Sequence, residues 1–273
     1  MTNLGTTVKQ ITNFLFEEVL CIRKTLTTDE LCGIVQEKFN IESIKFNRTI
    51  FDALIHTSFQ HEFAHKFHLV NNEKLEFLGD TVLSLVVTEK IYQDLIDLNE
   101  GEMSKLRSSI VNEETLSLIA KHIGLGKLIL LGKGELKEKG FEKDSILADT
   151  FEAVLGAMYI EQGLEEVKAF LLQTINRFEV KNKRSLFSKE IITQFDAKSK
   201  LQELIMKKYK VTPHYASEEL LVKGQKIFKV TLKIKNTEIY TTELSSKKKA
   251  MQLIAHKVLT ENILDKYEEK LCY

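Results

Sequence analysis

The sequence predicts two domains of different fold class, an all-α body followed by a smaller α+β module. Apolar residues recur every three or four positions through about the first 180 residues, which is the period of a helix. After the polar and basic stretch Lys181–Phe195, apolar and polar residues alternate instead, and alternation is typical of half-buried strands. With 273 residues, the chain can bury a substantial core in each domain.

The charge of the chain divides at the same place. Formal net charge is zero, with 39 basic and 39 acidic residues, and that average argues against a nucleic-acid partner. Residues Asp196–Leu264, however, contain 14 lysines against 7 acidic residues, a net charge of +7, whereas residues 1–195 carry 23 basic against 29 acidic residues, a net charge of −6. This asymmetry predicts a polyanionic partner for the basic module.

The body is expected to contain a series of helices. Thr27 and Glu30 have the spacing of a capping box for a helix that ends near Asn40. A long helix is predicted from about Asn72 toward Leu98, closed by the polar turn Asn99-Glu100-Gly101. Further helices are predicted over residues 102–111, 113–123, 145–161 and 164–179.

The module is expected to have the order α-β-β-β-α. Ala197–Tyr209 is a basic amphipathic helix, and Phe228, Val230, Leu232 and Ile234 alternate with polar residues as in a strand. A second alternating run covers residues 238–244, and a helix over residues 246–264 closes the unit.

The long helix carries a stripe of carboxylates. At 100° per residue, Glu73, Glu76 and Asp80 fall within an arc of about 60°. A solvated acidic face is the common explanation for such charges. It fits poorly here, because apolar residues cover most of the remaining circumference, as in a buried helix.

A second acidic pair lies on a helix that is otherwise almost wholly apolar. Asp149 and Glu152 share one face at a spacing of three residues. Because burying ionised carboxylates without partners is costly, bound Mg²⁺ is the expected explanation, with Mn²⁺ able to substitute. Two acidic helices packed together could hold two such ions for phosphodiester hydrolysis.

Several separated segments resemble the ribonuclease III family. NEKLEFLGDTVL (Asn72–Leu83) is similar to its signature segment, and DSILADTFEAVLGAMYI (Asp144–Ile160) to its second block. ALIHTSF, GEMSKL and LGKGE, at residues 53–59, 101–106 and 131–135, agree in order and spacing, and the resemblance extends from about residue 45 to residue 264. It implies an all-α ribonuclease III endonuclease domain joined to a double-stranded RNA-binding domain.

The resemblance also implies roles for the acidic residues. The family's metal-binding carboxylates match Glu76, Asp80, Asp149 and Glu152. Of these, Asp80 and Glu152 match the positions most directly tied to catalysis, and Glu73 and Glu100 match supporting acids. For Glu100 an ordinary solvated residue at a helix start is the alternative, and Glu100 ranks below the four metal-binding acids.

Phe77 matches a family aromatic that inserts into a second subunit, so the resemblance implies a homodimer. An ordinary core residue is the alternative, and the residues alone favour it. A dimer would place two acidic centres in one valley, each cutting one RNA strand. The expected products carry 5′-phosphate and 3′-hydroxyl ends with short 3′ overhangs.

The basic module resembles a double-stranded RNA-binding domain, a class that reads A-form shape over about 16 base pairs. Gln202 and Glu203 match its minor-groove contacts, and Lys247 and Lys248, at a helix start, are the expected phosphate contacts. One departure is the loop Val222–Lys226, which lacks the family's Gly-Pro and its groove-entering His. That contact is expected to be weaker, or made by Gln225 or Lys226.

The predicted organisation is an N-terminal helical extension (1–45), a catalytic domain (46–180), a linker (181–195), an RNA-binding domain (196–264) and a tail (265–273). Three cysteines without CxxC spacing indicate a reducing compartment, and no apolar run reaches the ~18 residues of a membrane span. We therefore expect a cytoplasmic enzyme without a membrane segment. The resemblance implies ribosomal precursors as substrates, while cleavage of messenger RNA, antisense duplexes, transfer RNA and other structured RNA is also open.

Two alternatives come from other classes. His61-Glu62-Phe63-Ala64-His65 fits the HExxH pattern of zinc proteases, with His68, Glu73 or Glu89 as a third ligand, although the segment falls between two family blocks. A non-catalytic RNA-binding scaffold on the same fold is the second alternative. Such a scaffold would be expected to lose some of the four core acids, and all four are present.

Overall fold

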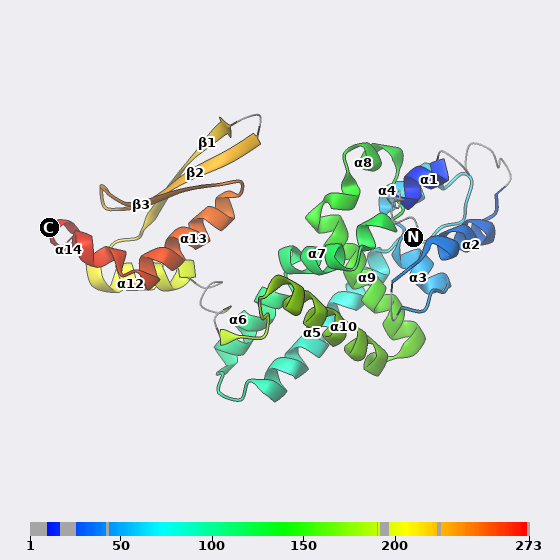
Figure 1. Cartoon of the computed structure of the whole chain (residues 1–273), viewed down its shortest axis with the longest axis horizontal. Helices are drawn as coiled ribbons and strands as arrows, with labels where there is room; N and C mark the ends of the chain where they lie inside the picture. Colours follow the sequence, from blue (N-terminus) through cyan, green and yellow to red (C-terminus); the bar gives the residue numbers. More distant parts are fainter. Residues whose placement is uncertain are drawn as a thin grey trace, which may run out of the picture. The chain divides into compact units, whose positions relative to one another are not determined.

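The computed structural model describes residues 10–16, 26–41, 44–189, 191, 197–222 and 225–271. The chain divides into two compact units, Met1–Leu186 and Phe187–Tyr273 (Figure 1). Cys21, Cys272, most of the expected linker after residue 189 and the loop residues Lys223 and Gly224 lie outside the described residues. In the described part, no helix is both long enough and apolar enough to cross a membrane.

The first unit is helical in its described residues, apart from an isolated bridge between Ile55 and Leu130. Its α-helices are α1 Ile11–Phe14, α2 Thr28–Lys38, α3 Arg48–Ala53, α4 Thr57–Phe63, α5 Glu73–Asp94, α6 Glu100–Ile110, α7 Glu113–His122, α8 Lys133–Lys137, α9 Asp144–Gln162 and α10 Leu164–Asn182. Two short 3₁₀ turns, η2 Leu125–Lys127 and η3 Gly140–Glu142, lie between α7 and α9.

Local capping explains where these helices begin. The predicted capping box of α2 is confirmed, since Thr27 Oγ1 accepts from the Glu30 amide at 3.2 Å and Glu30 Oε2 accepts from the Thr27 amide at 2.8 Å. The predicted turn at residues 99–101 is wrong. Asn99 forms a capping box with Glu102, so Glu100 and Gly101 belong to the first turn of α6.

The centre of the first unit is the crossing of α5 and α9, where two glycines meet the opposite backbone. A Cβ atom added to Gly79 would lie 1.8 Å from the carbonyl oxygen of Glu152, and one added to Gly156 would lie 2.2 Å from that of Leu75. No side chain fits at either point. The two glycines therefore let the helix backbones approach closely, which brings their polar faces together.

The second unit is the predicted α+β module. It consists of α12 Ala197–Tyr209, β1 His214–Val222, β2 Gln225–Ile234, β3 Thr237–Leu244 and α13 Lys247–Thr260, followed by the short helices η4 Ile263–Tyr267 and α14 Glu268–Leu271. The sheet is antiparallel with the order β1-β2-β3, and Leu232 pairs with Tyr215 on one side and Tyr240 on the other. The predicted fold class is confirmed.

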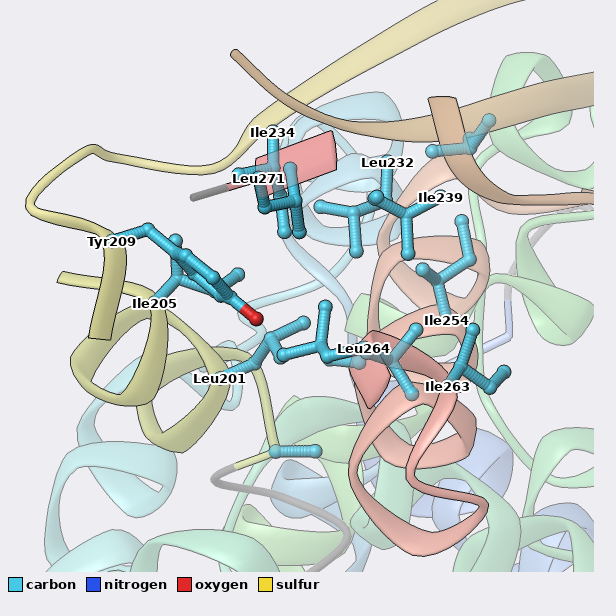
Figure 2. Packing of buried hydrophobic residues seen from close by; sticks show 14 of the residues in the cluster. Leu201, Ile205, Tyr209, Leu232, Ile234, Ile239, Ile254, Ile263, Leu264 and Leu271 are labelled. Carbon is cyan, nitrogen blue, oxygen red and sulfur yellow. The ribbon is translucent and has the colours of Figure 1, made fainter. Parts of the chain in front are cut away.

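The core of this unit lies between the sheet and its helices. Figure 2 shows Leu201, Ile205 and Tyr209 of α12 facing Leu232 and Ile234 of β2, which are fully buried as the alternation predicts. The closing helix ends at Thr260 instead of residue 264, because Asn262 adopts a left-handed conformation with φ 48°. Within the segment expected as a tail, α14 buries Leu271 in the same core.

Candidate functional site

The crossing of α5 and α9 assembles a group of carboxylates. Glu76, Asp149 and Glu152 each offer one oxygen, and these oxygens all lie within 4.8 Å of one another. All three side chains are half-buried. We call these three residues the carboxylate cluster. Among the described residues it is the one group of three or more acidic, histidine or cysteine side chains with this geometry.

The cluster is electrostatically strained. Burial, followed by the negative charges of Asp80, Glu76 and Asp149, raises the pKa of Glu152 from its ordinary 4.5 to about 8. Burial raises the pKa of Glu76 as well, with Asp149, Glu73 and Asp80 adding repulsion. Ionising all of these carboxylates at once is therefore unfavourable unless a cation compensates their charge.

The donor set fits a hard divalent cation. All ligand atoms of the cluster are carboxylate oxygens, which Mg²⁺ and Mn²⁺ prefer, and a cation would offset the repulsion that raises these pKa values. Neutral protein ligands such as histidine, which zinc sites commonly use, are absent from the cluster. The cluster can thus hold a divalent metal ion.

The structure separates the remaining predicted acids from this group of three oxygens. Asp80 and Glu73 are exposed on α5, and they act on the cluster through their charges. Glu100 is exposed in the first turn of α6, where its Oε1 accepts from Ser104 Oγ at 3.4 Å. Three of the four predicted core acids therefore share one oxygen cluster, and Asp80 lies at its margin.

The charge of Glu113 also acts on the site, although the sequence analysis did not name this residue. Its charge is the second cause, after burial, that raises the pKa of Asp149. Glu113 is the first residue of α7 and follows Asn112, whose side chain caps that helix. An acidic residue in a first turn is common because it complements the helix dipole, so the sequence offered no distinct signal.

Phe77 projects from α5 beside Glu76 and is 80% exposed. The alternative that it is an ordinary core residue is wrong for this chain. Two further large apolar side chains of the same helix, Leu85 and Tyr92, are 52% and 73% exposed. The helix that supplies Glu76 to the cluster therefore also presents an uncovered apolar surface.

The HExxH segment serves the packing of α8. Glu62 Oε2 accepts from the backbone amide of Lys133 at 2.6 Å, and Glu62 Oε1 lies 3.7 Å from Lys133 Nζ. Lys133 is the first residue of α8, so the Glu62 carboxylate offsets the partial positive charge at the N-terminus of that helix. Because its carboxylate is engaged in this way, the segment does not present the free base that a zinc protease needs.

The predicted RNA contacts of the second unit are exposed. Gln202 and Glu203 lie on α12, and Lys247 and Lys248 lie in the first turn of α13. In the adjoining hairpin, Val222 pairs with Gln225, and Lys226 Nζ forms an ion pair with Glu219 at 2.8 Å. Lys226 is therefore partly neutralised within the protein.

Comparisons with known proteins match each of the two units to a known family. Residues 47–178 match a family model described as ribonuclease-III-like, and residues 197–262 match the double-stranded RNA binding motif. The chain is 40% identical over 220 residues to ribonuclease 3 of Syntrophomonas wolfei, covering 80% of this chain and 90% of that protein. It is 38% identical over 230 residues to ribonuclease 3 of Borreliella burgdorferi, covering 82% and 91%.

Among solved structures, the nuclease domain of ribonuclease III from Campylobacter jejuni is similar at 36% identity and a TM-score of 0.45. The match covers 56% of this chain and 96% of that domain.

Proposed function

The chain belongs to the ribonuclease III family of double-stranded RNA endoribonucleases, and we propose that the carboxylate cluster is its cleavage centre. The observation that carries this proposal is the convergence of Glu76, Asp149 and Glu152 within 4.8 Å, inside the region matched by the nuclease model. Asp80 completes the proposed set from the margin. Mg²⁺ is the proposed ion, with Mn²⁺ able to replace it.

In this mechanism the protein positions the cation, and the cation activates the water that attacks the phosphodiester. A bound divalent cation supplies Lewis-acid activation of the attacking water and stabilises the leaving oxygen of the phosphodiester. Glu76 and Asp149 would hold such a cation from α5 and α9, and Glu152 would join them as a ligand once its carboxyl proton, retained longer because of the raised pKa, had passed to solvent. Asp80 and Glu113 add negative charge around the ligands, which favours a doubly charged cation.

The second unit supplies the affinity for the substrate. Double-stranded RNA is its partner, and we propose that Lys247 and Lys248 contact phosphates while Gln202 and Glu203 reach the minor groove. In this proposal the second unit binds the duplex and the carboxylate cluster cleaves it. Loss of the cluster should therefore spare duplex binding.

We also propose a homodimer, a cytoplasmic location and precursors of ribosomal and other structured RNA as substrates. The exposed side chain of Phe77 supports the dimer, because burying it against a second subunit would remove a large apolar surface from water. In the Phe77→Ala variant, light scattering should give the monomer mass of 31.4 kDa. A dimer of undiminished stability would contradict the proposed role of this residue.

The direct test uses the purified full chain and a long RNA duplex, with Mg²⁺ or with EDTA. We expect cleavage only with Mg²⁺, products with 5′-phosphate and 3′-hydroxyl ends, and no cleavage of the single strands alone. Asp149→Asn should abolish cleavage and leave duplex binding intact, whereas Asp97→Asn, a change at an exposed position outside the cluster, should have no effect. Binding without cleavage in the wild-type protein would favour the non-catalytic scaffold instead.

A further inference from the structure

Residues Gln10–Phe16, which we call the N-terminal arm, precede the segment matched by the nuclease model. We propose that this arm is a clamp that positions the first turn of α5, and with it Glu76, for cation binding. The inference rests on the proposed cleavage centre, and it assigns a role to Thr12, a positioning residue outside that centre. It follows from a continuous series of hydrogen bonds.

The first step joins the arm to the segment Ile129–Leu131. Thr12 is fully buried, and its Oγ1 donates to the carbonyl oxygen of Ile129 at 2.9 Å and accepts from the amide of Leu131 at 3.2 Å. Gln10 Nε2 donates to the same Ile129 oxygen at 2.7 Å. One hydroxyl thus satisfies two backbone groups on one edge of this segment, as a neighbouring strand would.

The second step lies on the opposite edge of the same segment. The amide of Leu130 donates to the carbonyl oxygen of Leu54 at 2.8 Å, and the carbonyl oxygen of Leu130 accepts from the amide of His56 at 3.1 Å. Ile55 and Leu130 form an isolated parallel bridge. Because successive residues of an extended chain direct their backbone groups to opposite edges, the arm and residues 54–56 hold this segment between them.

The third step reaches the carboxylate cluster. The carbonyl oxygen of Ile55 accepts from the amide of Asn72 at 3.0 Å, and the carbonyl oxygen of Asn72 accepts from the amide of Glu76 at 2.8 Å. Asn72 is the N-cap residue of α5, yet its side chain makes no capping hydrogen bond. The start of α5 is therefore held by this contact with Ile55 and by a longer bond of 3.3 Å from the Glu73 amide to Asn71 Oδ1, in addition to its close crossing with α9 at Gly156.

Because these hydrogen bonds are buried, the loss of one of them is costly. Ile129, Leu131 and Ile55 are fully buried, so water has no ready access to a group that loses its partner. Without the Thr12 hydroxyl, the Leu131 amide must find another acceptor, and the segment would shift against residues 54–56. Metal ligands need positions accurate to about 0.5 Å, so a small displacement of the α5 start would lower cation affinity.

The test compares Thr12→Val, which keeps the side-chain shape and removes the hydroxyl, with Thr12→Ser, which retains it. Mg²⁺ binding to the full chain without RNA is measured by calorimetry, and cleavage of an RNA duplex is measured as a function of Mg²⁺ concentration. Thr12→Val should weaken Mg²⁺ binding about 10-fold, the lower end of the effects seen for groups that support metal ligands. Its cleavage rate at saturating Mg²⁺ should stay within about twofold of wild type, because only binding is weakened. Thr12→Ser should restore the affinity.

Thr49→Val is the matched control, because the Thr49 hydroxyl donates to Glu161 and has no part in the series of bonds to Glu76. Wild-type Mg²⁺ affinity in Thr12→Val, or equal loss in Thr49→Val, would overturn the clamp. If Thr12→Val does not fold, Gln10→Met, which removes the bond to Ile129, must weaken Mg²⁺ binding for the clamp to stand. Failure of the wild-type protein to bind Mg²⁺ would instead refute the proposed cleavage centre.

Discussion

Replacing Glu152 by glutamine should abolish cleavage and at the same time stabilise the metal-free protein. The pKa of Glu152 rises from 4.5 to about 8 on folding, mainly because the side chain is buried and then because Asp80 and Glu76 repel its charge. Folding therefore favours the protonated form. Glutamine has the same shape, carries no charge, and so removes a penalty that the wild-type chain bears above its unfolded pKa.

The size of this effect follows from linkage. A raised carboxyl pKa gives stability that is complete below pH 4.5 and is lost as the pH rises to about 8. At 1.36 kcal/mol per pH unit the full loss is about 5 kcal/mol. Since the side chain is only half-buried, solvent screening reduces it to ~2 kcal/mol.

The assay is urea unfolding in EDTA between pH 4.5 and pH 8.5. Wild-type stability should fall relative to Glu152→Gln across this range, and the two proteins should be nearly equal at its acid end. Glu142→Gln, at a position of the same unit outside the cluster, should follow wild type. Adding Mg²⁺ should raise wild-type stability more than that of the variant, because the ion binds the folded state. A wild-type protein as stable as the variant at pH 8.5 in EDTA would refute the reasoning.

Three further outcomes are expected from the structure. Gly79→Ala should destabilise the nuclease unit by about 3 kcal/mol or more in thermal unfolding, because its Cβ atom would lie 1.8 Å from a backbone oxygen of α9; a change below about 1 kcal/mol would contradict the close crossing. Replacing Lys247 and Lys248 by Glu should weaken duplex binding and lower its salt slope by about 1 for each phosphate that the protein no longer neutralises, as measured in salt titrations. Glu113→Gln should lower the pKa of Asp149 in an NMR titration of the metal-free protein, since the charge of Glu113 helps to raise it. An unchanged pKa would show that the charge of Glu113 does not act on Asp149.

Much of the fold could be predicted because it depends on local rules. Alternation identified Val230, Leu232 and Ile234 as the buried face of β2, and the spacing of Thr27 and Glu30 identified the start of α2. Errors arose where a local signal had two meanings. Asn99-Glu100-Gly101 has the composition of a turn, but the Asn99 side chain instead caps a helix that includes the other two residues.

The sequence by itself determined which acids share a helix face and which part of the chain is basic, because helix geometry and charge are local properties. The tertiary structure decided which acids meet. Gly79 and Gly156 allow α5 and α9 to cross closely enough to bring Glu76 to Asp149 and Glu152. It also brought the charge of Glu113 near enough to raise the pKa of Asp149, left Phe77 exposed, and joined Thr12 to the segment Ile129–Leu131. These relations span residues distant in sequence, and only packing fixes the distances between them.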